Sequence, residues 1–87
     1  MRLTITAKAE RQLVKLPKTS QIIIAKKIRT LPSQTHEPGQ KLSGYKNLYR
    51  VRVGDYRMVY KRLKGEILVA LISHRKEVYQ MTRRLFK

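Results

Sequence analysis

A two-residue turn between two alternating runs constrains the fold of this chain more than any other feature. Residues 48–53 and 56–63 alternate apolar with polar side chains, and only Gly54 and Asp55 separate them. This pattern predicts two antiparallel strands joined by a tight hairpin, since glycine and aspartate suit the positive φ values of such turns. A loop of this length also fixes the register, because the residues on either side of it must pair.

A second turn signal, Lys64 with Gly65, joins the middle strand to a third one. The residues that follow, Ile67 to Ile72, are all apolar, which is typical of a strand that is covered on both faces near the centre of a sheet. In the register that this turn sets, Ile72 lies across from Arg57. We therefore expect the end of the third strand to deliver polar residues to the part of the sheet that holds Arg57, namely Ser73, His74 and Arg75.

The first half of the chain is predicted to form a short strand and a helical hairpin. Residues Arg2–Thr6 alternate, and the last of them is placed to cap a helix that ends at Pro17. A second helix, capped by Thr19 or Ser20, closes at Pro32. Apolar residues spaced three and four apart give each helix a face for the core: Ala9, Leu13 and Leu16 in the first, Ile24, Ile28 and Leu31 in the second.

The remaining segments complete the order of elements. Residues 33–44 collect Ser, Thr, Pro and Gly, which predicts a loop or a loosely packed crossover. Val78, Met81 and Leu85 form a helical stripe near the end of the chain. The predicted order is βααβββα, an α+β fold in one domain over residues 1–87, with a mainly antiparallel sheet packed against a helical hairpin and a C-terminal helix.

The register places three arginines on one face of the first hairpin. Arg50 and Arg52 share this face with Arg57, and Arg52 lies directly across from Arg57. Opposed like charges cost stability, so we expect an anion between them, and the planar guanidinium fork suits phosphate. The alternative is a solvated face that is kept charged against edge aggregation. The other face is predicted to be core and carries Tyr49, Val51, Val53, Tyr56, Met58 and Tyr60.

A tyrosine follows the second basic segment. If the final helix begins near Arg75, Tyr79 lies four residues on and shares its face. Cations beside an aromatic ring suit a single-stranded nucleotide, whose phosphate binds guanidinium and whose base stacks on the ring. His74 belongs to the residue type that titrates near neutral pH, and it is either an acid–base group of this site or an ordinary strand-end histidine. The other tyrosines are expected to pack in the core and hairpins: Tyr45, Tyr49, Tyr56 and Tyr60.

The charge of the whole chain agrees with an anion-binding site. Lysine and arginine number 21 against 5 acidic residues, which gives a formal net charge of +16. This surplus favours a polyanionic partner, which is nucleic acid, an acidic protein or an anionic membrane surface. The basic residues of the two helices are expected to form a solvated outer face that steers such a partner: Lys8, Arg11, Lys15, Lys18, Lys26, Lys27 and Arg29.

Composition also argues against several classes of protein. The chain has no cysteine, and His36 and His74 lie among too few carboxylates for a zinc site, so we expect no disulfide, metal or small-molecule cofactor. The apolar run 67–72 is far shorter than the ~18 residues of a membrane-spanning helix, and residues 1–8 hold no apolar signal-peptide stretch. We therefore expect a soluble, cytoplasmic protein with no membrane partner.

Two motifs resemble a known family. The run LYRVRVGDYRMVYK at residues 48–61 and the run HRKEVY at residues 74–79 are similar to the RelE/ParE superfamily of bacterial and archaeal toxin–antitoxin systems, with the RelE branch the closer one. The resemblance extends over the whole chain. It implies a ribosome-dependent endoribonuclease that cuts messenger RNA in the decoding site, without metal, with the 2′-hydroxyl of the RNA as nucleophile. It also implies a cognate acidic antitoxin as inhibitor.

The resemblance implies roles for individual residues. Arg50 and Arg52 match two basic positions on the strand before the hairpin, and Arg57 matches an arginine that steadies the transition-state phosphate. Arg75 and Tyr79 match a C-terminal basic and a tyrosine position. Well-studied members have lysines where this chain has Arg50 and Arg52, and an arginine is a poor general base but a good electrostatic clamp.

The base therefore stays open between His74, Tyr79 and catalysis by orientation and charge alone. We expect Lys46, Lys61 and Arg83 to contribute to RNA binding, and the remaining charge to dock on ribosomal RNA. Two rivals stay open as well: a ParE-like inhibitor of DNA gyrase, which shares the fold, and a non-catalytic basic RNA-binding module. The convergence of arginines with a tyrosine favours the endoribonuclease.

Overall fold

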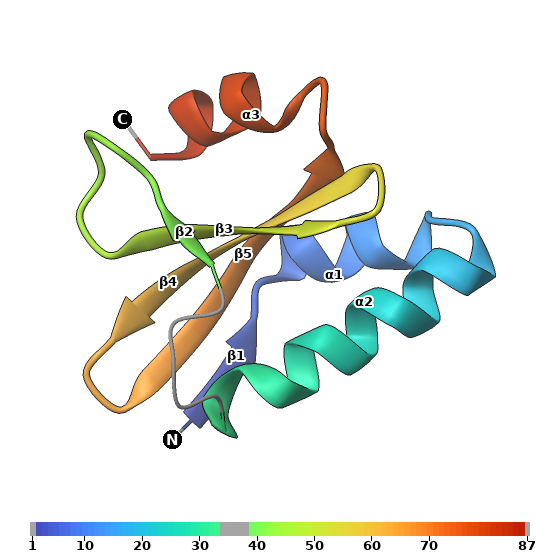
Figure 1. Ribbon diagram of the computed structural model, residues 1–87, viewed down its shortest axis with the longest axis horizontal. Helices are drawn as coiled ribbons and strands as arrows, with labels where there is room; N and C mark the ends of the chain where they lie inside the picture. The colour runs from blue at the N-terminus through green and yellow to red at the C-terminus, as the bar shows by residue number, and fades with distance from the viewer. Residues whose placement is uncertain (1, 34–38, 87) are drawn as a thin grey trace.

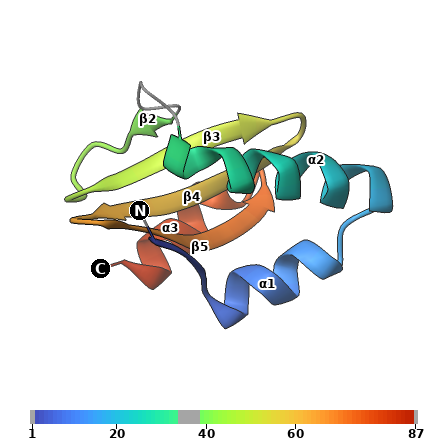
Figure 2. The same cartoon turned by 90° about the horizontal axis from the view of Figure 1, so that it is seen from below.

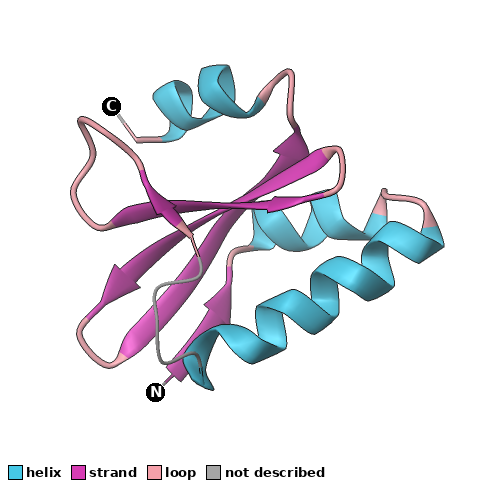
Figure 3. Ribbon diagram, viewed as in Figure 1, coloured by secondary structure: helices cyan, strands magenta, loops and turns pink. Residues whose placement is uncertain are grey.

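The computed structural model describes residues 2–33 and 39–86 and arranges them in three layers, with helices on both sides of one sheet (Figures 1 and 3). Residues 34–38 of the segment that was predicted as a loop, which include His36, lie outside the described residues. The elements are β1 (Arg2–Ile5), α1 (Ala7–Val14), α2 (Lys18–Thr30), a short 3₁₀ turn (Leu31–Ser33), β2 (Gln40–Lys41), β3 (Leu48–Val53), β4 (Tyr56–Leu63), β5 (Glu66–His74) and α3 (Val78–Leu85).

The sheet has the strand order β1-β5-β4-β3-β2, and every neighbouring pair is antiparallel except β1 with β5. The predicted α+β fold and the order βααβββα are confirmed, with one addition. The two-residue strand β2 lies in the segment that was predicted as a loop, and it pairs with β3 through Gln40 opposite Arg50.

One of the two predicted helix caps is confirmed. The side-chain oxygen of Thr6 accepts a hydrogen bond of 3.1 Å from the amide of Ala9, at the start of α1. The prediction that Thr19 or Ser20 caps the second helix is wrong, because α2 begins at Lys18.

A glutamine explains why α2 begins early. The side-chain amide of Gln21 donates to the carbonyl oxygens of Val14 and Leu16, at 3.0 and 2.8 Å. Its backbone amide donates to the carbonyl of Pro17 at 3.0 Å. These bonds satisfy carbonyls at the end of α1 and start α2 directly after the proline, so the helical hairpin closes within a few residues.

The register of the first hairpin is as predicted. Arg52 pairs with Arg57 and Val53 with Tyr56, and Gly54 has a φ of +60° in the turn. The glycine supplies the left-handed conformation that this turn requires.

The register of the second hairpin is predicted correctly only near its turn. Leu63 pairs with Glu66, but a β-bulge at Val59/Tyr60 shifts the pairing beyond it by one residue. The expectation that Ile72 lies across from Arg57 is therefore wrong. Ile72 pairs with Met58 and Ser73 with Arg57, because a bulge places an extra residue in one strand. The shift keeps the side chain of Ile72 in the main core.

Helices α1 and α2 lie on one side of the sheet and α3 on the other (Figures 1 and 2). The two faces of the sheet carry separate cores. The face under α1 and α2 holds the larger one, as predicted, and Tyr49 stacks there on Tyr60 with ring centroids 5.5 Å apart. The smaller core lies under α3 and consists of Leu48, Val59, Leu71 and Val78.

The C-terminal helix begins at Val78, three residues later than the expected start near Arg75. The hydroxyl of Ser73 lies 3.1 Å from the sulfur of Met81, which joins α3 to β5. None of the helices in the described part of the chain is long and apolar enough to span a membrane.

Candidate functional site

Four arginines gather on the face of the sheet that α1 and α2 leave open. We call Arg50, Arg52, Arg57 and Arg75 the arginine cluster. Burial lowers the pKa of Arg57, and the positive charges of the other three lower it further, while Asp55 partly offsets them. No member of the cluster forms an ion pair with a carboxylate among residues 2–33 and 39–86. The cluster is therefore a concentration of positive charge that Asp55 offsets only in part, and such a surplus is what an anion site requires.

Hydrogen bonds to the hairpin turn orient Arg57. Its Nη1 donates to the carbonyl oxygens of Gly54 and Tyr56, both at 3.1 Å. One edge of the guanidinium is therefore held by the backbone, and the rest of the fork is left for a ligand. The tight turn thus has two roles, because it sets the strand register and supplies the acceptors that fix this side chain.

The connection between β5 and α3 brings the fourth arginine to the turn. The backbone amide of Arg75 donates to the carbonyl of Asp55 at 2.9 Å. This bond ties the tip of the first hairpin to the segment that leads into α3. The predicted approach of Arg75 to Arg57 is thereby explained, since the charge of Arg75 is one of those that lower the pKa of Arg57.

The structure does not bring His74 together with the cluster. His74 pairs across the strands with Tyr56, and the two rings meet edge to face with centroids 5.9 Å apart. Because Tyr56 packs against the main core, His74 lies on the opposite face from Arg57. Its Nδ1 accepts a hydrogen bond of 3.2 Å from the amide of Lys76, so the imidazole organises the turn before α3.

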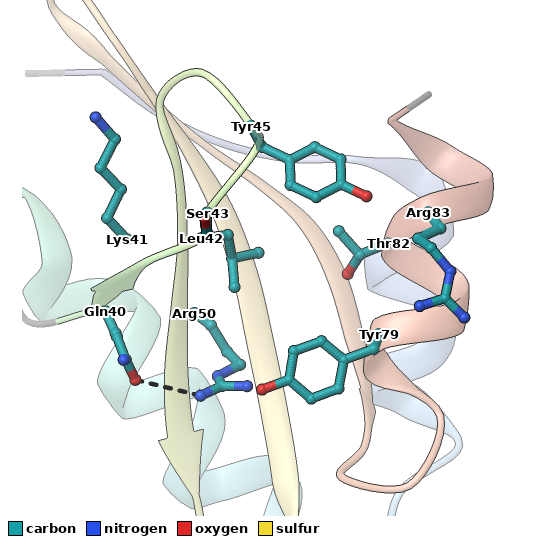
Figure 4. Close-up of a pocket in the computed structure, with 9 residues that line it drawn as sticks. All are labelled: Gln40, Lys41, Leu42, Ser43, Tyr45, Arg50, Tyr79, Thr82 and Arg83. Atoms are coloured by element: carbon teal, nitrogen blue, oxygen red, sulfur yellow. Dashed lines mark hydrogen bonds between the residues drawn. The ribbon is translucent and has the colours of Figure 1, made fainter.

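Tyr79 lies beside Arg50 in the structure, whereas the sequence pattern predicted it beside Arg75. The guanidinium carbon of Arg50 lies 4.9 Å from the centroid of the Tyr79 ring, within the range of a cation–π contact. The Nη2 of Arg50 donates to Oε1 of Gln40 at 3.2 Å, shown as a dashed line in Figure 4. Tyr79 as a whole residue remains 53% exposed. An exposed aromatic ring beside a cation is available to a ligand.

Sequence reasoning missed Gln40. It lies in β2, a strand too short to show alternation, and its segment was predicted as a loop. The nearest signal was the alternation of residues 48–53, which placed Arg50 on the charged face but did not reveal the neighbouring strand. Only the pairing of Gln40 with Arg50 across β2 and β3 shows the contact.

A cleft of about 390 Å³ opens beside Arg50 and Tyr79 (Figure 4). One wall is α3, and the other is the segment that runs from β2 to the start of β3. Arg50 lies between the walls, and Arg83, one of the predicted RNA-binding residues, lines the α3 side. The full lining is Gln40, Lys41, Leu42, Ser43, Tyr45, Arg50, Tyr79, Thr82 and Arg83.

The other two predicted RNA-binding residues lie elsewhere. Lys46 and Lys61 line a second pocket of about 430 Å³, together with Leu85 and Phe86 from the C-terminal end. They therefore do not join the arginine cluster. As for metal ligands, the described ranges contain no group of three or more His, Asp or Glu side chains that could hold an ion.

Comparisons with known proteins show the family of this chain. The family model for the ParE toxin of type II toxin–antitoxin system parDE matches residues 3–79. A RelE-like toxin protein of Escherichia coli is 30% identical over 73 residues, which cover 77% of each chain.

Solved structures share the fold. The isolated RelE toxin of Escherichia coli superposes with a TM-score of 0.70 at 26% identity, covering 98% of both chains. A chain of the RelB–RelE antitoxin–toxin complex of Methanococcus jannaschii gives a TM-score of 0.76 at 23% identity, covering 90% of this chain and 96% of that one. The sequence family, the related toxin and the shared fold agree: the chain belongs to the RelE/ParE toxins of type II toxin–antitoxin systems.

Proposed function

We propose that this protein inhibits translation by cutting messenger RNA in the decoding site of the ribosome, as a metal-independent endoribonuclease in the cytoplasm. The observation that carries the proposal is the arginine cluster, four guanidinium groups with no carboxylate partner in the described structure, beside the exposed ring of Tyr79. Phosphate is the anion whose geometry matches such forks, and single-stranded RNA adds a base to stack on an aromatic ring.

In this proposal the 2′-hydroxyl of the RNA attacks the adjacent phosphorus, and the bond to the 5′-oxygen of the next nucleotide breaks. Arg57 stabilises the negative charge that develops on the phosphate, because it is held by the turn and surrounded by further cations. Arg50, Arg52 and Arg75 bind the flanking phosphates. Guanidinium does not accept a proton at ordinary pH, so these residues act by charge and position.

The proton of the 2′-hydroxyl needs another acceptor. We assign no proton transfer to His74, because its ring lies against Tyr56 on the other face. Tyr79 is exposed beside Arg50 and is the remaining candidate for this acceptor. With no strong base in place, the rate depends on how well the ribosome orients the RNA.

We also propose an acidic antitoxin as the partner that inhibits the protein. A structurally similar chain is found in the RelB–RelE complex of Methanococcus jannaschii. The formal charge of +16 would attract an acidic segment to the open face of the sheet. Co-expression of the acidic gene beside this one should restore growth, and equal growth arrest with and without that gene would contradict the assignment.

The decisive experiment compares naked and ribosome-bound RNA. The purified protein is incubated with one messenger RNA, either alone or on programmed ribosomes, and 5′ ends are mapped. We expect cuts confined to the translated frame on ribosomes. Arg57→Ala should produce none of them, and it controls for a contaminating nuclease. Equal cleavage of the RNA in both tubes would refute the proposal.

A second candidate is a ParE-like inhibitor of DNA gyrase, which is favoured by the family model that matches residues 3–79. The same preparation should then block supercoiling of relaxed plasmid by gyrase and leave ribosome-bound RNA intact. RNA binding with neither activity would select the non-catalytic module instead.

A further inference from the structure

Arg50 is held in the arginine cluster by side chains of two other elements. The side-chain amide of Gln40 on β2 accepts a hydrogen bond of 3.2 Å from Nη2 of Arg50. The ring of Tyr79 on α3 lies with its centroid 4.9 Å from the guanidinium carbon. Figure 4 shows these two side chains approaching Arg50 from opposite sides. The guanidinium is therefore fixed between β2 and α3, although Arg50 itself belongs to β3.

Both of these partners are uncharged. An amide oxygen accepts a hydrogen bond without adding a negative charge, and an aromatic ring attracts a cation through its quadrupole. Arg50 thus keeps its full positive charge, and this charge contributes to lowering the pKa of Arg57. A carboxylate in place of the Gln40 amide would also orient Arg50, but it would cancel the charge that an anion needs.

Repulsion within the arginine cluster makes such a restraint necessary. Like charges on one face of a sheet repel each other, and a long arginine side chain loses much rotamer freedom when it is fixed. Without partners, the guanidinium of Arg50 would turn away from Arg57 into solvent. Arg57 has a restraint of its own, since its Nη1 donates to two backbone carbonyls of the hairpin turn, both at 3.1 Å. Uncharged acceptors therefore orient both arginines.

Close packing of the neighbouring backbone fixes the position of Gln40. A Cβ atom added at Gly39 would lie 3.0 Å from the hydroxyl oxygen of Tyr60 and 3.1 Å from the carbonyl oxygen of Arg50. Tyr60 is fully buried, so its ring cannot move aside. The glycine therefore lets the start of β2 approach β3 closely, and this approach places Gln40 directly across from Arg50.

We propose that Gln40 is a positioning residue of the phosphate site. Its amide oxygen holds the guanidinium of Arg50 against the Tyr79 ring and leaves the charge of Arg50 available to an anion. The inference rests on the proposed function, in which Arg50 binds a phosphate that flanks the reacting one. The short strand β2 thereby becomes part of the site.

The first test observes Arg50 in the free protein. The ring current of Tyr79 should shift the NMR resonances of the Arg50 side chain upfield, because the guanidinium lies over the ring. Gln40→Ala should move these resonances toward the values of an unrestrained arginine. Ser43→Ala is the matched control and should leave them unchanged, since Ser43 is exposed, uncharged and lines the same cleft. Parental resonances in Gln40→Ala would overturn the inference.

The second test measures binding without cleavage. The probe is a fluorescein-labelled single-stranded RNA with 2′-O-methyl riboses, which lack the attacking hydroxyl, and fluorescence anisotropy gives its affinity. Gln40→Ala should weaken binding by about 3- to 10-fold, the equivalent of one net hydrogen bond. Gln40→Glu should keep the NMR resonances of the parent yet weaken binding further, because its carboxylate neutralises Arg50. A Gln40→Glu protein that binds the probe as tightly as the parent does would overturn the inference.

A double-mutant cycle separates positioning from direct contact. If Gln40 acts through Arg50, Gln40→Ala should not change the affinity of a protein that already carries Arg50→Ala. An equal loss in both backgrounds would overturn the inference, because Gln40 would then contact the RNA itself or support the fold. Failure of the proposed function gives a different result. Arg50→Ala would then bind the probe as the parent does, while the NMR resonances would still report whether Gln40 holds Arg50.

Discussion

The two faces of the sheet differ in how completely they are covered. On the face under α1 and α2, the side chains of Met58, Tyr60 and Ile67 are fully buried. On the opposite face α3 covers the smaller core, while Arg52 at the hairpin tip stays exposed. The strands β3 and β4 run through both environments, since their residues alternate between them.

This difference separates the part of the molecule that stabilises the fold from the part where we propose the site. The covered face excludes apolar surface from water, which is the main favourable contribution to folding. The open face holds Arg52 directly across from Arg57, an arrangement that costs stability. In our proposal the charge of this pair binds an anion, and the first face supplies the stability that tolerates the pair.

The largest expected effect is on activity at the open face. Arg57→Ala removes the cation at the centre of the cluster, and loss of preorganised charge commonly lowers the rate by about 10²-fold or more. Single-turnover cleavage on saturating programmed ribosomes should fall by at least that factor. The thermal unfolding midpoint should stay the same or rise, because repulsion within the cluster is relieved.

Arg57→Lys is the matched control for this change. Lysine keeps the positive charge but not the planar fork, so its rate should lie between those of the parent and Arg57→Ala. A folded Arg57→Ala that cuts at the parental rate would show that the site lies elsewhere.

Local signals explain which parts of the fold were predictable. The register of β3 with β4 follows from Gly54 and Asp55, because a tight turn fixes pairing on both sides. The start of α1 follows from the side chain of Thr6. Each of these features depends on residues close in sequence, whose chemistry the sequence shows directly.

Features that depend on distant residues were not predictable. The bulge in β5 changes which residue faces Arg57, and it depends on what the whole sheet must bury. His74 was expected beside the arginines because a continuous register was assumed. The bulge shifts that register and pairs His74 with Tyr56 instead. The cleft also escaped prediction, because the contact of Gln40 with Arg50 exists only once β2 has paired with β3.

The next effect concerns stability of the covered face. Ile28 on α2 is 2% exposed, so Ile28→Ala should lower the free energy of unfolding by about 2–5 kcal/mol. Met81 on α3 is only half-buried against the smaller core, and Met81→Ala should cost less than about 2 kcal/mol. Urea unfolding measures both. Equal losses would show that the two faces contribute alike to folding.

A smaller effect should appear at the like-charge pair. Arg52→Glu converts a repulsive cross-strand pair into an attractive one, which is worth about 0.2–1 kcal/mol, while cleavage should fall. The lowered pKa of Arg57 means that its charged form is disfavoured in the folded protein. This cost is fully present below the folded pKa and fades as pH rises toward the ordinary arginine value.

The gain from Arg52→Glu should therefore be constant between pH 6 and 9, and it should fall to the level of Arg52→Gln as the introduced carboxylate is protonated near pH ~4. Arg52→Gln, which removes repulsion without adding attraction, is the control and should show no such loss in acid. Urea unfolding of the three proteins at several pH values makes the comparison. A loss of stability in Arg52→Glu at pH 7 would contradict the view that the pair is repulsive.

The smallest effect is expected on the outer surface of the helical hairpin. Lys26 is exposed on α2, on the other side of the sheet from α3 and the open face (Figures 1 and 2). If it only steers the protein toward ribosomal RNA, Lys26→Ala should reduce the slope of log affinity against log salt by about 0.7 to 0.9, the value for one lost phosphate contact. Cleavage at saturating ribosomes should stay within error of the parent, because the proposed site lies on the opposite face. Binding titrations across a salt series, followed by single-turnover cleavage with the same preparation, measure both quantities. A large loss of cleavage at saturation would place a catalytic contribution on the helical hairpin. It would contradict the view that one face stabilises the fold while the other carries the proposed site.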